Sequence, residues 1–262
     1  MTKRAAFFDC DKTVIPGSSL YLLARGMYER DFIRVRRIAS FAWGQITFRL
    51  TGSERMGLVD DIQEFALGFV KGRHREELHQ LGVEIARERI LPRVYADMVR
   101  IIQHHESLGH ETYLVTATPL EIAEVIAEGL GMTGALGTRS ELDDAGCYTG
   151  KLAGPLLHGP EKSKAVEALA VEKGFDLTEC AAYSDSINDL PLLEAVGHAH
   201  AVNPEPKLRR LARARGWPIH ELRTRRRALL IGIPSTVGGL GLFASGIAVG
   251  MWAARRRGNG AR

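Results

Sequence analysis

Two carboxylates one residue apart, Asp9 and Asp11, directly follow the apolar run Ala5–Phe8. A short, fully apolar run is typical of a strand buried in a parallel sheet, and ligands bind at the carboxyl ends of such strands. One Asp would be enough to cap the helix that follows the turn. Two crowded carboxylates raise each other's pKa unless a cation lies between them. The pair therefore indicates a Mg²⁺ site, or a nucleophile with an acid/base partner.

Two more predicted strands end in polar residues. The run 111–119 carries Thr116 near its end, and the run 180–183 leads into Asp185 and Asp189. Because the carboxyl ends of parallel strands lie on one edge of a sheet, these side chains are expected to share a crevice. An all-oxygen ligand set suits Mg²⁺. The carboxylates expected at this metal site are Asp9, Asp11, Asp185 and Asp189.

A lysine at the start of a predicted helix supplies positive charge for a phosphate site. Lys164 directly precedes the helix predicted over 165–173. Its ammonium group, the Thr116 hydroxyl, the cation and nearby backbone N–H groups would together surround a phosphate. A carboxylate nucleophile in such a site would form an aspartyl-phosphate intermediate.

The four segments resemble the motifs of the haloacid dehalogenase (HAD) superfamily, in particular its subfamily IB, which contains the phosphoserine phosphatases. The DxDxT motif is Asp9-Cys10-Asp11-Lys12-Thr13, and the hydroxyl motif is Thr116 within Leu114-Val115-Thr116-Ala117-Thr118. The lysine motif is placed at Lys164, with Lys162 as the alternative. The last motif, GDxxND, is Ser184-Asp185-Ser186-Ile187-Asn188-Asp189, in which Ser184 replaces Gly.

This resemblance covers residues 4–204 and implies a role for each site residue. Asp9 would be the nucleophile, and Asp11 the general acid and then the base. Mg²⁺ would be held by Asp9, the Asp11 backbone carbonyl and Asp185, supported by Asp189. The residues that would bind phosphate are Thr116, Ala117, Lys164 and Asn188.

The elements around these motifs predict an α/β fold with a doubly wound, Rossmann-like parallel sheet. Residues 1–17 and 91–204 form the expected catalytic core, with helices over 92–108 and 121–130 and a hairpin within 135–153. The intervening residues 18–90 have helical spacing and almost no strand signal. The resemblance identifies this insert as a mobile helical C1 cap that excludes water.

Composition and charge divide the chain into an acidic body and a basic tail. The three cysteines are scattered, which indicates reduced thiols, and no apolar segment of a signal peptide precedes the first strand. Residues 205–262 hold 13 Lys and Arg against 2 acids, whereas residues 1–204 hold 22 against 29. The two parts are therefore expected to have different partners.

The tail contains 27 consecutive uncharged residues, 228–254, which is long enough to cross a bilayer as a helix. A buried C-terminal helix is the alternative. The flanking segments 205–227 and 255–262 are basic, so the first is expected to be a juxtamembrane segment that binds anionic lipids rather than nucleic acid. Gly246 and Gly250 have GxxxG spacing, which suggests a homodimer through this helix. The expected arrangement is a cytoplasmic catalytic domain with a C-terminal membrane anchor.

The leading hypothesis is a membrane-anchored, Mg²⁺-dependent phosphomonoesterase acting on a phosphorylated lipid or lipid precursor. The alternative is a phosphatase of a soluble metabolite such as phosphoserine. Phosphoserine phosphatases carry a Glu shortly after the first motif, where this chain has Ser18. A third hypothesis is a non-catalytic, membrane-tethered binding module, which would not need the acid/base residue Asp11.

Overall fold

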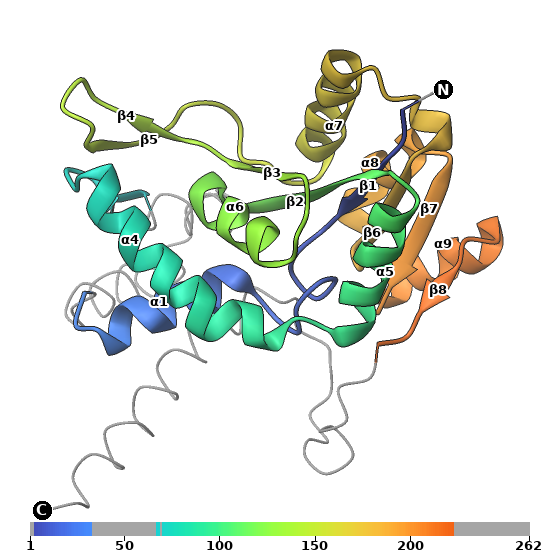
Figure 1. The fold of residues 1–262 in the computed structure, drawn as a ribbon, viewed down its shortest axis with the longest axis horizontal. Helices are drawn as coiled ribbons and strands as arrows, with labels where there is room; N and C mark the ends of the chain where they lie inside the picture. The colour runs from blue at the N-terminus through green and yellow to red at the C-terminus, as the bar shows by residue number, and fades with distance from the viewer. Residues whose placement is uncertain (1–2, 33–66, 69, 223–262) are drawn as a thin grey trace, which may run out of the picture.

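A six-stranded parallel sheet forms the centre of the molecule (Figure 1). The structure is a computed structural model that describes residues 3–32, 67–68 and 70–222. The order of the strands is β3-β2-β1-β6-β7-β8. Their bounds are β1 (Ala5–Phe8), β2 (Glu111–Pro119), β3 (Gly134–Thr138), β6 (Ala181–Ser184), β7 (His198–Val202) and β8 (Ile219–His220).

Strand β1 lies in the interior of this sheet, next to the point where the strand order reverses. The chain runs from β1 to β2 and β3 on one side and then returns to β6 on the other side of β1. A ligand crevice forms outside the carboxyl ends of the strands at such a reversal. Asp9 directly follows β1 and Asp185 directly follows β6, so both lie at this edge of the sheet.

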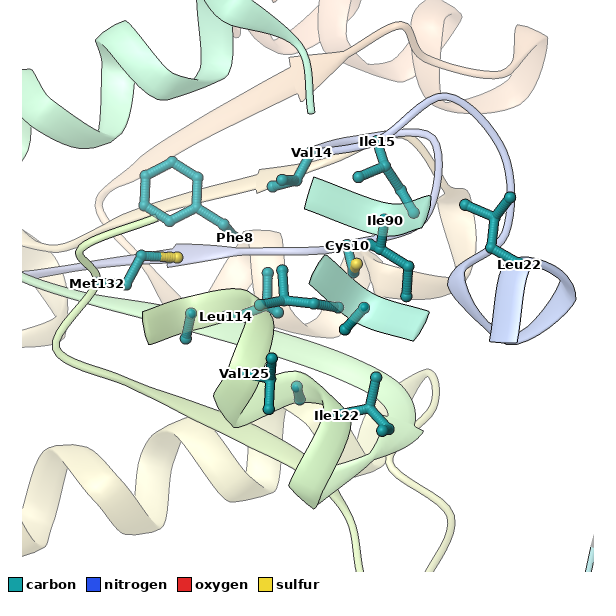
Figure 2. Close-up of a cluster of buried hydrophobic side chains, with 14 of the residues drawn as sticks. Phe8, Cys10, Val14, Ile15, Leu22, Ile90, Leu114, Ile122, Val125 and Met132 are labelled. Atoms are coloured by element: carbon teal, nitrogen blue, oxygen red, sulfur yellow. The ribbon is translucent and has the colours of Figure 1, made fainter. Parts of the chain in front are cut away.

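Helices cover both faces of the sheet, as predicted for a doubly wound fold. Helices α5 (Ala96–Ser107) and α6 (Leu120–Gly129) pack on one face, where Phe8 and Leu114 are buried (Figure 2). The opposite face buries Phe7 and Val115 beneath α7 (Pro160–Lys173), α8 (Leu190–Ala195) and α9 (Pro206–Arg215). Neighbouring residues of one strand point to opposite faces, so an all-apolar strand fills both cores.

The part of the cap that the structure describes is helical. Helix α1 (Ser19–Glu29) packs against α4 (Arg75–Ile85), which continues into a π-helix (Ala86–Ile90) and a 3₁₀ turn (Leu91–Arg93). A Cβ at Gly26 would lie 2.5 Å from Ile85 Cγ2, so the glycine permits the close approach of the two helices. Residues 33–66 lie outside the described ranges, and the predicted cap limits, 18–90, stay a prediction.

The predicted hairpin is present, although it is shorter than expected. Strands β4 (Ser140–Leu142) and β5 (Tyr148–Leu152) pair antiparallel, and Asp143 Oδ1 accepts the N–H groups of Ala145 and Cys147 in the turn. The preceding run, β3, instead pairs with β2 as the edge of the main sheet.

The folded body extends beyond its predicted end at residue 204, and the prediction that 205–227 is a juxtamembrane segment stays a prediction. Helix α9 buries Leu208 and Ala212, and β8 adds a parallel strand beside β7. These two residues are four apart, which gives the basic helix one apolar stripe toward the core.

The predicted membrane helix 228–254 and basic tail 255–262 lie outside the described residues. None of the helices within 3–32, 67–68 and 70–222 has the length and hydrophobicity that a bilayer span requires.

Candidate active site

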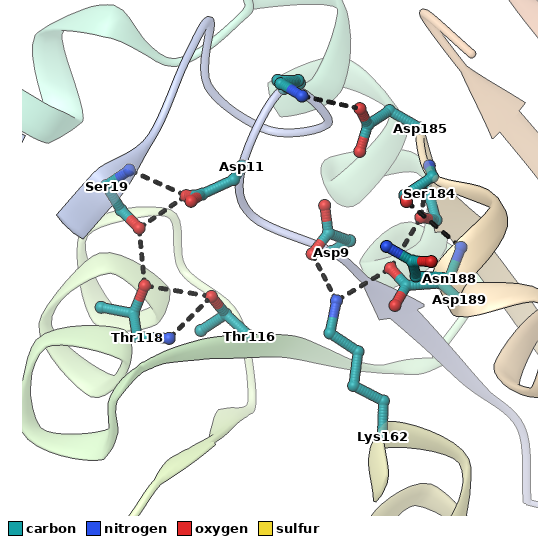
Figure 3. A network of polar contacts seen from close by, with 12 residues as sticks. Asp9, Asp11, Ser19, Thr116, Thr118, Lys162, Ser184, Asp185, Asn188 and Asp189 are labelled. Carbon is teal, nitrogen blue, oxygen red and sulfur yellow. Dashed lines mark hydrogen bonds and ion pairs between the residues drawn. The ribbon is translucent and has the colours of Figure 1, made fainter. Parts of the chain in front are cut away.

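The structure brings the predicted strand ends together at one edge of the sheet (Figure 3). Asp9 follows β1, Thr116 lies in β2, and Asp185 and Asp189 follow β6. Asp9, Thr116, Asp185 and Asp189 are all buried, whereas Asp11 is half-buried. These side chains therefore lie together at the carboxyl edge of the sheet, and their roles as site residues stay predictions.

Lys162, not Lys164, contacts the buried carboxylates at this edge. Lys162 Nζ lies 2.5 Å from Asp9 Oδ1 and 2.8 Å from Asp189 Oδ2, and Ser184 Oγ donates to the same Asp189 oxygen at 2.7 Å. The Lys162 side chain is only 4% exposed. Lys164, the lysine predicted to bind phosphate, is 67% exposed and pairs with Glu161.

The physical reason for this correction is the start of helix α7. The helix begins at Pro160 rather than at residue 165, so Lys162 lies in its first turn. Two residues along an α-helix correspond to a rotation of about 200°, and the two lysines therefore point in opposite directions. The dipeptide Gly159-Pro160 in the sequence could have predicted that the helix begins at Pro160, because proline favours the first helical position. Gly159 has φ +56° and ψ −126°, a conformation that favours glycine.

The buried charges do not balance. Burial, opposed by Lys162, raises the pKa of Asp9 to about 6. Burial and the neighbouring Asp9 raise the pKa of Asp185 to about 8. The cation beside Asp185 is the exposed Lys12, with its Nζ 4.0 Å from Oδ2. Among the described residues, three buried carboxylates (Asp9, Asp185, Asp189) thus share one buried ammonium group, an arrangement that favours a further cation.

The four predicted metal carboxylates do not converge on one point. Among the described residues, no group of three acidic, His or Cys side chains has the geometry of a metal site. Asp189 contacts Lys162 and Ser184, whereas the Asp11 side chain points toward Ser19 and Asp185 toward the Lys12 side (Figure 3). The metal-binding roles of Asp9, Asp11, Asp185 and Asp189 stay predictions.

The Asp11 carboxylate accepts two hydrogen bonds from one residue, Ser19, which the sequence interpretation does not include. Its Oδ1 accepts the N–H of Ser19 at 2.8 Å and the hydroxyl of Ser19 at 2.5 Å. Ser19 Oγ lies 2.6 Å from Thr118 Oγ1, and Thr116 donates to Thr118 at 3.1 Å. The available signal was Thr118 itself, which lies two residues after Thr116 and therefore on the same face of the strand.

The two other predicted phosphate ligands lie at the same edge. Ala117 O accepts the hydroxyl of Thr138 at 2.8 Å, which fixes the backbone beside Thr116. Asn188 is exposed, and its N–H donates to Ser186 Oγ. Phosphate binding by Ala117 and Asn188 stays a prediction.

The chain is similar to several known proteins in sequence and in structure. The sequence model of the haloacid dehalogenase-like hydrolases matches residues 6–194. A phosphoserine phosphatase of Mycobacterium tuberculosis, SerB1, is 44% identical, with 97% of this chain and 81% of that protein covered. A histidinol-phosphatase of Neisseria meningitidis is 30% identical, with coverages of 83% and 98%. A crystal structure of a protein of unknown function from Bordetella pertussis is 31% identical, with a TM-score of 0.74 and coverages of 85% and 100%.

Proposed function

Because this chain belongs to the haloacid dehalogenase-like hydrolase family and is one of its phosphatases, we propose that it hydrolyses phosphate monoesters of small 2-amino alcohols. The proposed mechanism rests on the position of Lys162, which is buried and contacts both Asp9 and Asp189 at the edge of the sheet that also holds Thr116. The substrate class rests on the two named relatives. Phosphoserine and histidinol phosphate both carry an amino group on the carbon next to the phosphorylated CH₂ group.

In the proposed reaction, a carboxylate oxygen of Asp9 attacks phosphorus and the bond between phosphorus and the leaving oxygen breaks. Asp11 gives its proton to the leaving alcohol. It then takes a proton from the water that hydrolyses the aspartyl phosphate, which releases inorganic phosphate and regenerates Asp9. Burial raises the pKa of Asp9, and Lys162 opposes that rise, which favours the ionised carboxylate that acts as the nucleophile.

Lys162 and Thr116 are the proposed phosphate ligands of this chain. The ammonium of Lys162 stabilises the charge on the phosphoryl oxygens, and the Thr116 hydroxyl donates to one of them. Lys162 stays protonated, because Asp9 and Asp189 raise its pKa even though burial opposes them.

Mg²⁺ is the proposed cofactor. The Asp9 and Asp185 carboxylates and the Asp11 backbone carbonyl would hold it, since oxygen ligands suit this ion. A bound Mg²⁺ would neutralise negative charge on the phosphoryl group. The excess of buried carboxylates over buried cations supports this proposal.

The small-metabolite alternative is favoured over the lipid substrate that the tail suggested, because the named relatives act on small metabolites. Ser18 does not supply a carboxylate for the substrate ammonium. Its hydroxyl instead caps α1 by accepting the N–H of Tyr21. The proposal therefore places the group that recognises the amine elsewhere in the chain.

Phosphate release from a panel of substrates tests the proposal. L-phosphoserine and histidinol phosphate are compared with lysophosphatidate, with and without Mg²⁺, for the wild type and for Asp9→Asn. We expect Mg²⁺-dependent turnover of an amino-alcohol phosphate that Asp9→Asn abolishes. A preference for lysophosphatidate would overturn the substrate class, and unchanged turnover by the variant would overturn the nucleophile.

Membrane attachment through residues 228–254 stays a proposal from the sequence. It is supported by the 27 uncharged residues and their basic flanks. The full-length protein should float with vesicles that contain anionic lipid, and recovery in the vesicle-free fraction would contradict this. Pairing through Gly246 and Gly250 would make the extracted protein a dimer in detergent.

A further inference from the structure

Two hydroxyl groups, those of Ser19 and Thr118, connect Asp11 to the hydroxyl of Thr116 (Figure 3). Asp11 Oδ1 accepts from Ser19 Oγ at 2.5 Å, Ser19 Oγ lies 2.6 Å from Thr118 Oγ1, and Thr118 Oγ1 accepts from Thr116 Oγ1 at 3.1 Å. The three residues are almost fully buried, with exposures of 0% for Ser19, 2% for Thr116 and 4% for Thr118. Ser19 begins helix α1, whereas both threonines belong to β2, so the chain of hydroxyls also joins the cap to the core.

The hydrogen bonds of this chain have one direction. Asp11 Oδ1 accepts the backbone N–H of Ser19, so it is an acceptor both in the carboxylate and in the acid that carries its proton on Oδ2, and the single hydrogen of Ser19 Oγ points to Asp11. Ser19 Oγ must then accept the hydrogen of Thr118, and Thr118 accepts the hydrogen of Thr116. Hydrogen bonds that follow one another in this way strengthen each other in a buried site. The Asp11 carboxylate is thus held by a network that ends at the predicted phosphate ligand.

Because Thr116 is the first donor of these hydrogen bonds, phosphate binding at Thr116 would affect the whole network. Thr116 has one hydroxyl hydrogen, which it donates either to Thr118 or to an oxygen of a bound phosphate. The backbone N–H of Thr118 donates to Thr116 Oγ1 at 3.2 Å and keeps that oxygen in place in both cases. Occupation of the phosphate site therefore changes the first donor of the network that holds Asp11.

We propose that Ser19 and Thr118 are positioning residues, which place the acid/base carboxylate of Asp11 through the hydroxyl network that starts at Thr116. This inference rests on the proposed function, in which Asp11 gives a proton to the leaving alcohol. A misplacement of about 1 Å in such a group can cost about 100-fold in rate. Ser19 acts through the Asp11 carboxylate that it holds, and Thr118 acts through Ser19.

Two phosphate esters that differ in their need for a proton test this role. The leaving group of an alkyl ester such as phosphoserine is a strongly basic alkoxide, which needs the proton of Asp11 to leave as the alcohol. The leaving group of p-nitrophenyl phosphate is a stable phenolate, which needs no proton. Because kcat/KM reports the steps up to the release of the alcohol, it isolates the acid role from the later base role. For Thr118→Val and Ser19→Ala, we expect kcat/KM for the alkyl ester to fall at least about 10-fold more than for the aryl ester. Thr118→Ser, which keeps the hydroxyl, should restore the wild-type ratio of the two kcat/KM values.

Thr112→Val is the matched control. Thr112 is a buried threonine at the other end of β2, and its hydroxyl donates to Glu106. This variant should keep the wild-type ratio even if it is less stable. If Thr118→Val fails to fold, Ser19→Ala carries the test. A change in the ratio smaller than about 10-fold in the folded variants would overturn the inference. No wild-type turnover of any ester would instead overturn the proposed function.

Discussion

Replacement of Lys162 by Met is expected to cost the protein both stability and activity. The ammonium group lies 2.5 Å from Asp9 Oδ1 and 2.8 Å from Asp189 Oδ2, and the three side chains are 3–9% exposed. Methionine has a similar length but no charge, so two carboxylates would stay buried without their cation. Removing one partner of a buried ion pair costs about 3–5 kcal/mol, and we expect this loss of unfolding free energy at pH 7 without metal.

The loss of unfolding free energy in Lys162→Met should depend on pH. Asp9 has a pKa of about 6, and Lys162 opposes the rise that burial causes. In Lys162→Met the pKa of Asp9 should therefore lie higher still. A carboxyl group with a raised pKa in the folded state destabilises the protein when it ionises, so the loss should be larger at pH 8 than at pH 5. For the same reason the acid limb of the activity profile should move to higher pH.

Urea unfolding at pH 5, 7 and 8 and phosphate release from p-nitrophenyl phosphate measure these effects. Lys164→Met is the matched control, because Lys164 is 67% exposed and pairs only with its helix neighbour Glu161 in the described residues. We expect this control to change stability by less than about 0.5 kcal/mol and to keep its activity. Loss of activity in Lys164→Met together with wild-type stability of Lys162→Met would refute the reasoning.

Three further predictions concern pH, the cofactor and the start of helix α7. Burial first, and neighbouring histidines second, lower the pKa values of His105 and His200 to about 4. Because the unfolded histidines take up protons at a higher pH than the folded ones, the free energy of unfolding should be highest above pH 6.5. For each ring it should fall by about 2 kcal/mol at pH 5 and by about 3 kcal/mol at pH 4. A free energy of unfolding that stays constant from pH 7 to 5 would contradict this. Mg²⁺ at about 100 times its Kd should raise the free energy of unfolding by about 2.7 kcal/mol in a thermal melt, and Asp185→Asn should remove that increase. Gly159→Ala should cost about 1–3 kcal/mol and lower the turnover number, since φ +56° with ψ −126° is unfavourable for alanine; unchanged turnover would argue against a role of this turn in placing Lys162.

Local patterns in the sequence were enough to predict the sheet and the edge at which the chemistry lies. The apolar run Ala5–Phe8 predicts a buried strand because four apolar residues fill both faces of a sheet, and the two cores confirm it. The strand ends predict that Asp9, Thr116 and Asp185 meet, because parallel strands share one carboxyl edge. These inferences need only the period of the side chains and the order of strand and turn, which neighbouring residues determine.

Only the tertiary structure decided which side chains meet within that edge. The choice between Lys162 and Lys164 depends on the rotation of α7, which is set by the packing of Val166 and Ala170 against the core on the same face as Lys162. The composition of the basic segment after residue 204 predicts lipid binding, whereas in the structure α9 packs beside β7 and β8 adds the last strand of the sheet. Ser19 and Thr118 are 99 positions apart, and their contact depends on how the cap helix packs on β2. A helix phase, an edge pairing and a contact across the chain all depend on packing partners that no local window contains.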